Sequence, residues 1–532
     1  DVTNVDSLGI VTARSGINMS GGQFLVGTGV TIGVAGVATF RSGMIDVGDA
    51  LKNTSVGQLA GDAHTTGSNN TALGYLALSA NTTGGSNVAV GYAALDANTT
   101  GSQNIAIGYA ALGQSNADAN TALGYNTLQA NTTGQYNTAL GGNALEANTT
   151  ANSNVAIGKN ALLSNTTGTG NLAVGAFALD ANTTSSYSTA VGFNALSAST
   201  GAENTAFGAY ALVTCSTGIQ NTSLGYSALE KVTTGSYNTA VGHKALEENL
   251  ASNNTAIGFG ALEANTTASG NVAVGYGALE SNTTGDKNTA VGAYTLDVVT
   301  TGANNTGVGY GVLTNNTASD NTGVGKWALN SNTTGDYNTS VGSGALDSNT
   351  TGDRNTAVGY NALTTNVDGD RNVAIGYQAL KTMDPSSNAD TMNVGVGYAA
   401  LEATTTGVNN TGVGGYVMQQ NTTGGYNCAF GEQALVANTT GNLNTALGYQ
   451  ALNDSTTADN QVAIGAYALD EATTDAGNSV AIGYLAASAV VATPVVAVGY
   501  RALLVNTTGA NNTAVGYDAM VANTTGSYNT AF

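Results

Sequence analysis

The sequence is poor in charged residues, proline, cysteine, histidine and tryptophan. Only 8% of its 532 residues are charged, and it contains 2 Pro, 2 Cys, 2 His and 1 Trp. His64 and His243 lie far apart in the chain, and no phosphate-binding loop is present, so we expect no catalysis. Cys215 and Cys428 have neither the spacing of a zinc site nor that of a disulfide framework. These absences favour a non-enzymatic protein without a cofactor.

The charge balance and hydropathy argue against two further classes of function. The chain has 33 acidic and 12 basic residues, a net charge of −21, whereas nucleic-acid binding requires a basic surface. No apolar run approaches the ~18 residues of a membrane-spanning helix, and no signal peptide is visible. Because the chain begins without Met and ends inside a repeat, we expect it to be part of a longer protein.

What the sequence does contain is a repeat. The segment Asn-Thr-Ala-Val-Gly recurs with variations at 29 starts between Asn53 and Asn529, and most of the spacings are 17 residues. The idealised unit is Asn-Thr-Ala-Val-Gly-Tyr-x-Ala-Leu-x-x-Asn-Thr-Thr-Gly-x-x, whose residues we number as positions 1 to 17. A fixed period of this length indicates an array of similar structural units instead of several separate domains.

Each position of the repeat has its own restricted composition. Position 4 is always Val, Ile, Leu or Phe, position 3 is only Ala, Ser or Gly, and position 5 is Gly in all 28 copies that reach it. Positions 2 to 4 predict a short strand and positions 12 to 15 a turn, while the position-5 Gly predicts a bend or a close backbone approach. Stacked turns place like residues on one another, which predicts ladders such as Asn70, Asn87 and Asn104, Gly74, Gly91 and Gly108, and Leu78, Leu95 and Leu112.

The fold predicted from this pattern is all-β, a parallel β-solenoid with one 17-residue unit per turn. Residues 53–532 form about 28 turns, which at ~4.8 Å per turn make a shaft of roughly 130–140 Å. Residues 1–52 do not follow the period and are predicted to be an N-terminal β-rich segment. Stacking also places Cys215 and Cys428 many turns apart, which excludes a disulfide between them.

The small interior of such a turn favours an oligomer. Positions 4 and 9 are the two large apolar residues of each unit, and we assign both to the core. A single chain with so few core side chains is marginal, whereas three chains around a shared axis would bury more surface. The sequence therefore predicts a homotrimeric rod, with the small residues of position 3 as the candidate contact between chains.

Both prolines sit where the period changes. Pro385 lies in the single 21-residue spacing, and Pro494 lies near a turn without Asn-Thr-Thr-Gly. Proline cannot donate a hydrogen bond to a ladder, so a loop is expected at each place. Asp384 and Pro385 are the candidate for a protruding loop, although a tolerated insertion is the preferred interpretation.

The repeat resembles two groups of proteins. Asn154–Gly158 (NVAIG) and Ser479–Gly483 (SVAIG) resemble the repeats of YadA-like heads of trimeric autotransporter adhesins, which implies a left-handed parallel β-roll and a homotrimer, although the period is longer here. Asn444–Leu452 (NTALGYQAL) and the opening Val2–Asn18 resemble tail-fibre-type repeat proteins of marine bacteriophages, similar to those of cyanophages. The second resemblance implies a fibre protein of a virion.

Other side-chain patterns suggest weaker hypotheses. Carboxylates at position 10 of consecutive turns could hold Ca²⁺, although a solvated acidic edge is the preferred interpretation. The paired Thr residues of positions 13 and 14 suggest ice binding, and exposed Tyr residues at position 6 suggest glycan binding; we rank both below a structural role. The acidic candidates are Glu230, Glu247, Glu263, Glu280 and Asp297, and the tyrosines include Tyr75, Tyr92, Tyr276, Tyr360 and Tyr517.

The sequence therefore favours a structural function. The leading hypothesis is the shaft of a phage tail fibre, located outside the cell or on the virion, that spaces a host-recognition tip from the particle. The alternative is the stalk or head of a bacterial surface adhesin or filament. The expected partners are other copies of the chain, further virion or fibre proteins and, through a tip beyond this sequence, a host receptor.

Overall fold

The structure is a computed structural model. It describes residues 51–385, 387, 389–473, 477–491 and 494–532. The chain divides into two units, Asp1–Gly48 and Asp49–Phe532, and the description below concerns the second. The predicted β-rich segment 1–52 lies outside the described residues except for Leu51 and Lys52. No helix among the residues described is long and apolar enough to span a membrane.

Every repeat contributes one short strand to a single sheet of 29 strands. The strands fall on positions 2 to 4, as predicted, because Thr, Val and Ile favour extended backbone and the following Gly ends the strand. Their bounds are β1 (Thr54–Val56), β2 (Thr71–Leu73), β3 (Val88–Val90), β4 (Ile105–Ile107), β5 (Thr121–Leu123), β6 (Thr138–Leu140), β7 (Val155–Ile157), β8 (Leu172–Val174), β9 (Thr189–Val191), β10 (Thr205–Phe207), β11 (Thr222–Leu224), β12 (Thr239–Val241), β13 (Thr255–Ile257), β14 (Val272–Val274), β15 (Thr289–Val291), β16 (Thr306–Val308), β17 (Thr322–Val324), β18 (Thr339–Val341), β19 (Thr356–Val358), β21 (Val373–Ile375), β23 (Val394–Val396), β24 (Thr411–Val413), β25 (Cys428–Phe430), β26 (Thr445–Leu447), β27 (Val462–Ile464), β28 (Val480–Ile482), β29 (Val495–Val498), β30 (Asn512–Val515) and β31 (Thr530–Ala531).

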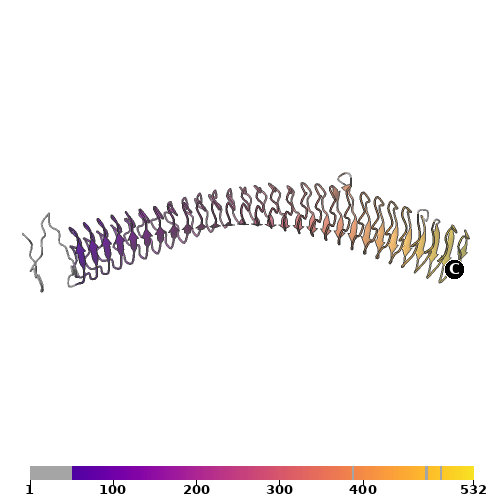
Figure 1. The fold of residues 1–532 in the computed structure, drawn as a ribbon, viewed down its shortest axis with the longest axis horizontal. Coiled ribbons are helices and arrows are strands. Elements are labelled where there is room, and N and C mark those ends of the chain that lie inside the picture. The colour runs from indigo at the N-terminus through magenta and orange to yellow at the C-terminus, as the bar shows by residue number, and fades with distance from the viewer. Residues whose placement is uncertain (1–50, 386, 388, 474–476, 492–493) are drawn as a thin grey trace, which may run out of the picture. The chain divides into compact units, whose positions relative to one another are not determined.

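Each strand pairs in parallel with the strands of the preceding and following turns (Figure 1). The register aligns like positions: in β13 and β14, Thr255 pairs with Val272, Ala256 with Ala273, and Ile257 with Val274. The predicted all-β parallel β-solenoid of about 28 turns is thereby confirmed. A second sheet of two strands, β20 (Gly369–Asp370) and β22 (Ala389–Asp390), accompanies the longest turn.

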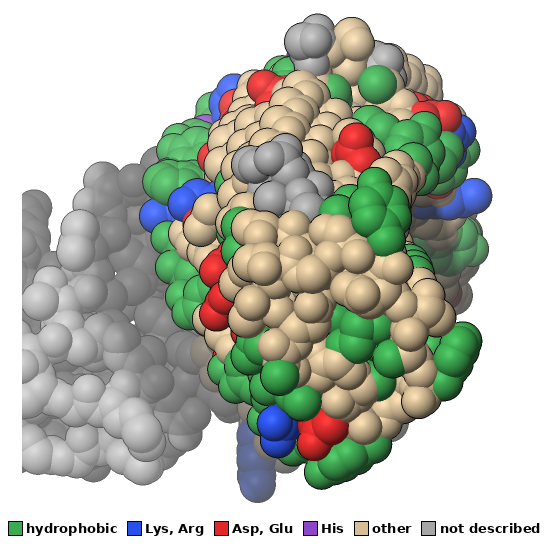
Figure 2. Space-filling model, turned by 90° about the vertical axis from the view of Figure 1, so that its right-hand side faces the viewer, with side chains coloured by type: hydrophobic (Ala, Val, Ile, Leu, Met, Phe, Trp, Pro, Cys, Tyr) green, Lys and Arg blue, Asp and Glu red, His purple; other side chains and the backbone are tan. Residues whose placement is uncertain are grey.

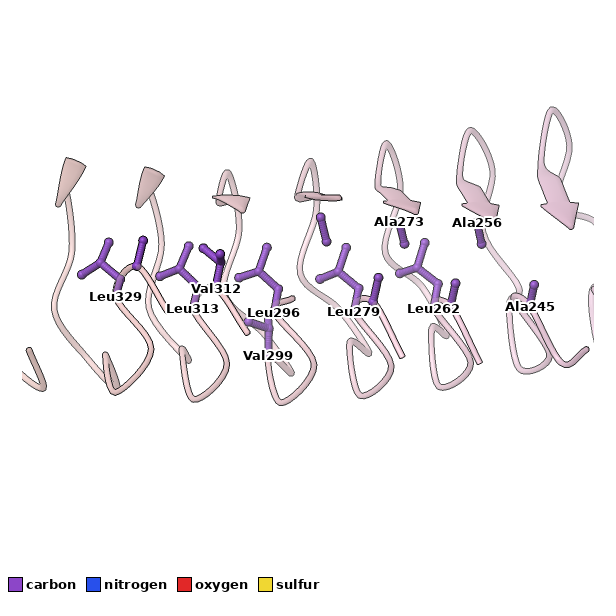
Figure 3. Packing of buried hydrophobic residues seen from close by; sticks show 14 of the residues in the cluster. Ala245, Ala256, Leu262, Ala273, Leu279, Leu296, Val299, Val312, Leu313 and Leu329 are labelled. Atoms are coloured by element: carbon purple, nitrogen blue, oxygen red, sulfur yellow. The ribbon is translucent and has the colours of Figure 1, made fainter. Parts of the chain in front are cut away.

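The core is a narrow strip of Ala and Leu inside the turns. Position 9 supplies its largest side chains, such as Leu262 and Leu279, which are fully buried. The small residues of positions 3 and 8 pack around them, and Figure 3 shows Ala256 and Ala273 pointing from their strands toward the row of leucines. The interior is thus one leucine wide and continues from turn to turn.

The position-5 glycines are required for two reasons at once. Gly91 has a φ of +133°, in the region that L-residues rarely adopt. A Cβ on Gly91 would lie 2.4 Å from the carbonyl oxygen of Gly108 in the next turn. Gly74 and Gly108 have the same geometry toward their own next turns. Both the bend and the close approach predicted from the sequence are therefore present.

Two buried asparagine ladders hold successive turns together. At position 1, the Asn87 backbone N–H donates to Oδ1 of Asn70 (2.9 Å), and the Asn104 N–H donates to Oδ1 of Asn87 (2.9 Å). At position 12, Nδ2 of Asn98 donates to Oδ1 of the position-12 Asn in the preceding turn (2.9 Å). The Gly101 carbonyl accepts from Nδ2 of both Asn87 and Asn98. Both asparagines are fully buried, and the bonds that their Nδ2 groups donate avoid the cost of unpaired buried N–H groups. Oδ1 of Asn98 accepts no bond from the described residues, because Ser115 replaces the position-12 Asn of the next turn.

The loop half of each turn contains left-handed residues that are not glycine. Position 9 has a φ of +53° at Leu78, +52° at Leu95 and +52° at Leu112, and position 7 has +51° at Ala93. Such a conformation costs on the order of 1–3 kcal/mol for each residue. Hydrogen bonds to the next turn oppose that cost, as from the Leu95 N–H to the Ala111 carbonyl (3.0 Å).

Two predictions about the packing of the turn are wrong. Position 4 is not in the core: its side chains are half-buried or exposed in every turn, with Leu224 49% exposed. Position 3 cannot contact another chain, because residues such as Ala256 are fully buried inside their own turn. Successive side chains of a strand point to opposite sides. The small residue of position 3 lies on the inner side, because the leucine of position 9 fills the interior, and positions 2 and 4 therefore lie on the outer side.

Changes in turn length are confined to one part of the repeat. The turns of 16, 18 and 21 residues all gain or lose residues after position 12, and positions 1 to 12 keep their length throughout. This part of constant length contains the strand, the glycine bend, the core leucine and both asparagine ladders. The changes in turn length therefore fall outside the segment that aligns one turn with the next, and they leave the register of the strands unchanged.

Candidate interaction face

The outer side of the sheet is an uncharged surface with one apolar row at position 4 and a row at position 2 in which Thr is the commonest residue; we call it the strand face. It is formed by the side chains of positions 2 and 4 in the 29 strands. Position 2 carries only Thr, Val, Ile, Leu or Cys, and position 4 only Val, Ile, Leu or Phe. All 45 Lys, Arg, Asp and Glu residues of the chain lie elsewhere.

The strand face exposes much of its apolar surface in the single chain. Ile257 is 40% exposed, Phe430 40% and Leu447 47%. If each position-4 side chain leaves on the order of 50 Å² exposed, the 29 strands together offer on the order of 1,400 Å². That exceeds the roughly 800 Å² that each partner buries in a standard protein interface. Figure 2 views the stack from its C-terminal end and shows apolar side chains in patches separated by backbone and other side chains.

A second apolar feature is a ladder of aromatic rings beyond the glycine bend. Tyr75, Tyr92, Tyr109 and Tyr125 occupy position 6 of consecutive turns, with ring centroids 4.9–5.4 Å apart and nearly parallel planes. Such offset stacks contribute roughly 0.5–1.5 kcal/mol per pair. We call this feature the aromatic ladder.

The aromatic ladder also uses position 7, which sequence reasoning missed. Tyr294 stands at position 7 of a turn whose position 6 is Ala293. Its ring meets those of Tyr276 and Tyr310 edge-on, at 63° and 84°. Tyr210, Tyr416 and Tyr467 likewise follow a small residue at position 6. That pairing of a small residue with a following aromatic one is the signal that could have revealed them.

The acidic candidates of position 10 lie in one row, and a lysine side chain already pairs with two of them. Nζ of Lys244 is 3.0 Å from Oε2 of Glu247 and 3.3 Å from Oε1 of Glu263. Glu230, Glu280 and Asp297 continue the row. Among the described residues, no group of three or more carboxylate, imidazole or thiol side chains is placed to hold a metal ion.

Aspartates at position 10 lie in a partly desolvated place. Burial is the largest cause that raises their pKa above the ordinary value, and hydrogen bonds from backbone N–H groups oppose it in most of them. For Asp297, the neighbouring Glu280 adds to the increase in the pKa. The aspartates whose pKa is raised in this way are Asp96, Asp180, Asp297, Asp347 and Asp470.

The histidines and cysteines are not brought together. His243 is a rung of the aromatic ladder, stacked between Tyr226 and Phe259 at 5.4 and 5.1 Å, and His64 lies in the first turn. Both cysteines are free thiols, as predicted. Cys215 replaces the buried Asn of position 12, and burial raises the pKa of its thiol to about 11.

The remaining sequence candidates have defined places in the turn. Asp384 is exposed, whereas Pro385 is buried against Gly369 of the preceding turn; residues 386 and 388 lie outside the described residues. At position 13, threonine hydroxyls donate along the stack, as from Oγ1 of Thr82 to the carbonyl of Thr99 (3.0 Å). These hydroxyls are engaged in the solenoid itself.

Comparison with known proteins identified no similar protein. No protein-family model, no curated protein and no solved structure matches this chain. The structure by itself identifies the chain as a β-solenoid repeat protein with turns of about 17 residues.

Proposed function

We propose that this chain is the structural shaft of an extracellular fibre, built by in-register association of identical copies through the strand face. The observation that carries the proposal is the uncharged, half-exposed strand face, which runs through the turns without interruption. Contiguous apolar surface of this size marks an interaction site in soluble proteins. A second copy has the same turn spacing, so its apolar rows match this face from turn to turn.

The proposed assembly is a homotrimer with its axis along the stack. Each chain of a trimer contacts two neighbours, and the strand face has two rows, positions 2 and 4, to offer them. The charged residues remain outside this contact, where a net charge of −21 per chain limits association between finished fibres.

We further propose a place for the shaft and a role in spacing. The fibre belongs to a phage virion and holds a host-recognition part away from the particle, with other virion or fibre proteins and a host receptor as partners. The resemblance of the repeat text to phage fibre proteins supports this. The shaft has no catalytic role and requires no cofactor. The alternative, a bacterial surface adhesin, is favoured by the NVAIG text of Asn154–Gly158.

Sedimentation equilibrium over a range of concentrations tests the assembly. We expect three times the chain mass at micromolar concentration, and a monomer mass there would exclude the homotrimer. Labelling with antibodies raised against the chain tests its location. Label along fibres of purified virions supports the phage proposal, whereas label on bacterial cells without phage would favour the adhesin.

A further inference from the structure

A groove runs along the stack beside the aromatic ladder, on a different part of the turn from the strand face. It consists of two hollows of about 350 and 460 Å³ that share Gln114 and Gln129 as lining residues. The first hollow is lined by positions 6, 7, 10 and 11 of consecutive turns, and Gly113 leaves its position 10 without a side chain. The second continues along the stack and is lined by positions 10 and 11 alone. The groove is therefore elongated parallel to the stack.

One wall of the groove is aromatic. Tyr92 and Tyr109 line the first hollow with their rings stacked at 4.9 Å and an interplanar angle of 5°. Each tyrosine is nearly half exposed, at 47% and 48%. The buried Ala93 and Ala110 lie beside them. This wall offers apolar ring edges and hydroxyl groups held at fixed spacing.

The other groups in the groove are amides and carboxylates. The carboxamides of Gln114 and Gln129 make no hydrogen bond to any residue that the structure describes, and Asp96 and Glu146 lie on either side of them. No Lys, Arg or His lines either hollow. The groove can therefore exchange hydrogen bonds with hydroxyl groups, while it disfavours anionic ligands such as sulfated or sialylated chains.

The backbone around the groove has no strand edge to offer a peptide. The N–H groups of position 11 donate to the carbonyls of position 10 in the next turn, from Ala97 to Gly113 (3.1 Å), from Gln114 to Gln129 (3.1 Å) and from Ala130 to Glu146 (3.0 Å). An extended peptide that adds to a sheet gains most of its affinity by bonding to backbone N–H and carbonyl groups that have no partner. A polymer of rings with hydroxyl groups and apolar faces can bind through side chains and does not need unpaired backbone groups.

We propose that this groove binds a neutral glycan in an extended conformation along the stack, with Tyr92 and Tyr109 packing against its sugar rings and Gln114, Gln129 and Asp96 bonding its hydroxyls. This proposal does not depend on association through the strand face. It also differs from an aromatic ladder that only stabilises the fold, because the amides would have no part in such a role.

The test applies the whole chain to an array of neutral, sialylated and sulfated oligosaccharides, followed by calorimetric titration with the best neutral ligand. Tyr92→Ala and Tyr109→Ala remove the wall. Gly113→Leu fills the groove, and Leu163 at position 10 shows that the turn accepts this side chain. Each change is expected to weaken binding by about tenfold or more, which corresponds to about 1.4 kcal/mol.

Matched controls separate binding from folding. Tyr377→Ala removes a ladder ring flanked by Tyr360 and Tyr398 in distant turns, and Ser197→Leu places the same side chain at position 10 of another turn. Both controls should retain full affinity. If circular dichroism shows that Gly113→Leu does not fold, the affinities of the Tyr92→Ala and Tyr109→Ala variants test the proposal. Absence of neutral-glycan binding, equal losses in the controls, or capture of peptides in place of glycans would overturn the proposal.

Discussion

Positions 4 and 9 both carry large apolar residues in nearly every repeat, yet they occupy opposite environments in the turn. Leu279 at position 9 is fully buried, whereas Ile257 at position 4 is 40% exposed. Position 4 is a large apolar residue in every turn, and so is position 9 in every turn except those with Gly61 and Ala487. A single chain explains this restriction at position 9 but leaves it unexplained at position 4, where polar residues would fit the exposed side of a strand. On our proposal, the difference reflects two separate constraints on the sequence, one from folding and one from association between copies.

The glycine bend between these positions should be the least tolerant point. Ala at position 275 would have to adopt a φ of +143° with its Cβ 2.5 Å from the carbonyl oxygen of Gly292. We expect Gly275→Ala to destabilise the stack by at least about 3 kcal/mol, measured by urea denaturation. Gly142→Ala is the control, because nothing lies within 4 Å of its added Cβ. Equal effects of the two changes would contradict this account of position 5.

The buried column should be the next most sensitive. Leu279→Ala leaves a cavity in a core that is one leucine wide, and we expect it to cost about 2–5 kcal/mol in the free energy of unfolding. The loss should appear at every protein concentration, since the contact lies within one chain. A loss below about 0.5 kcal/mol, typical of a surface substitution, would show that the interior is not the main source of stability.

The exposed column should respond only in the assembly. Ile257→Ala removes apolar surface that, on our proposal, a neighbouring copy covers, so we expect a loss of about 1 kcal/mol per chain in the assembled state. In dilute monomer the loss should fall below about 0.5 kcal/mol. Thermal unfolding at several concentrations, checked by sedimentation, measures both. The same loss in monomer and assembly would place Ile257 in the fold and not in an interface.

The smallest effect is expected at position 10. Burial raises the pKa of Asp347, so the folded chain binds a proton more readily than the unfolded chain, and ionisation at neutral pH costs stability. We expect Asp347→Asn to stabilise the solenoid at neutral pH by up to about 0.5 kcal/mol. The gain should vanish as the pH falls through the raised pKa toward the ordinary Asp value of 3.8.

Melting curves of the two chains across this pH range measure the effect. Asn330 occupies position 10 of the preceding turn, which shows that an amide fits. Asp384→Asn, at an exposed site, is the control. A gain that persists in acid would assign the effect to the amide and not to relief of the buried charge.

The sequence predicted the period, the strands and the role of Gly91, because repetition within one chain reveals which positions tolerate no change. It did not predict which side of the strand faces inward, because Ile257 and Leu279 are equally apolar and only the path of the backbone distinguishes them. Nor did it predict the left-handed conformation of Leu95, since propensity favours Gly or Asn there and inter-turn hydrogen bonds outweigh the strain. The groove depends on neighbouring turns, and Gly113 gave no signal on its own.

The direction of the inter-turn hydrogen bonds has a mechanical consequence. The strands run across the stack, so the hydrogen bonds between turns point along it. Tension along the fibre therefore breaks these bonds one turn after another and loads only a few of them at a time. Contacts between copies through the strand face lie parallel to the pull and would share the load in shear over many turns. A lone chain is therefore expected to open at low force along the stack, and association of copies through the strand face would raise that force.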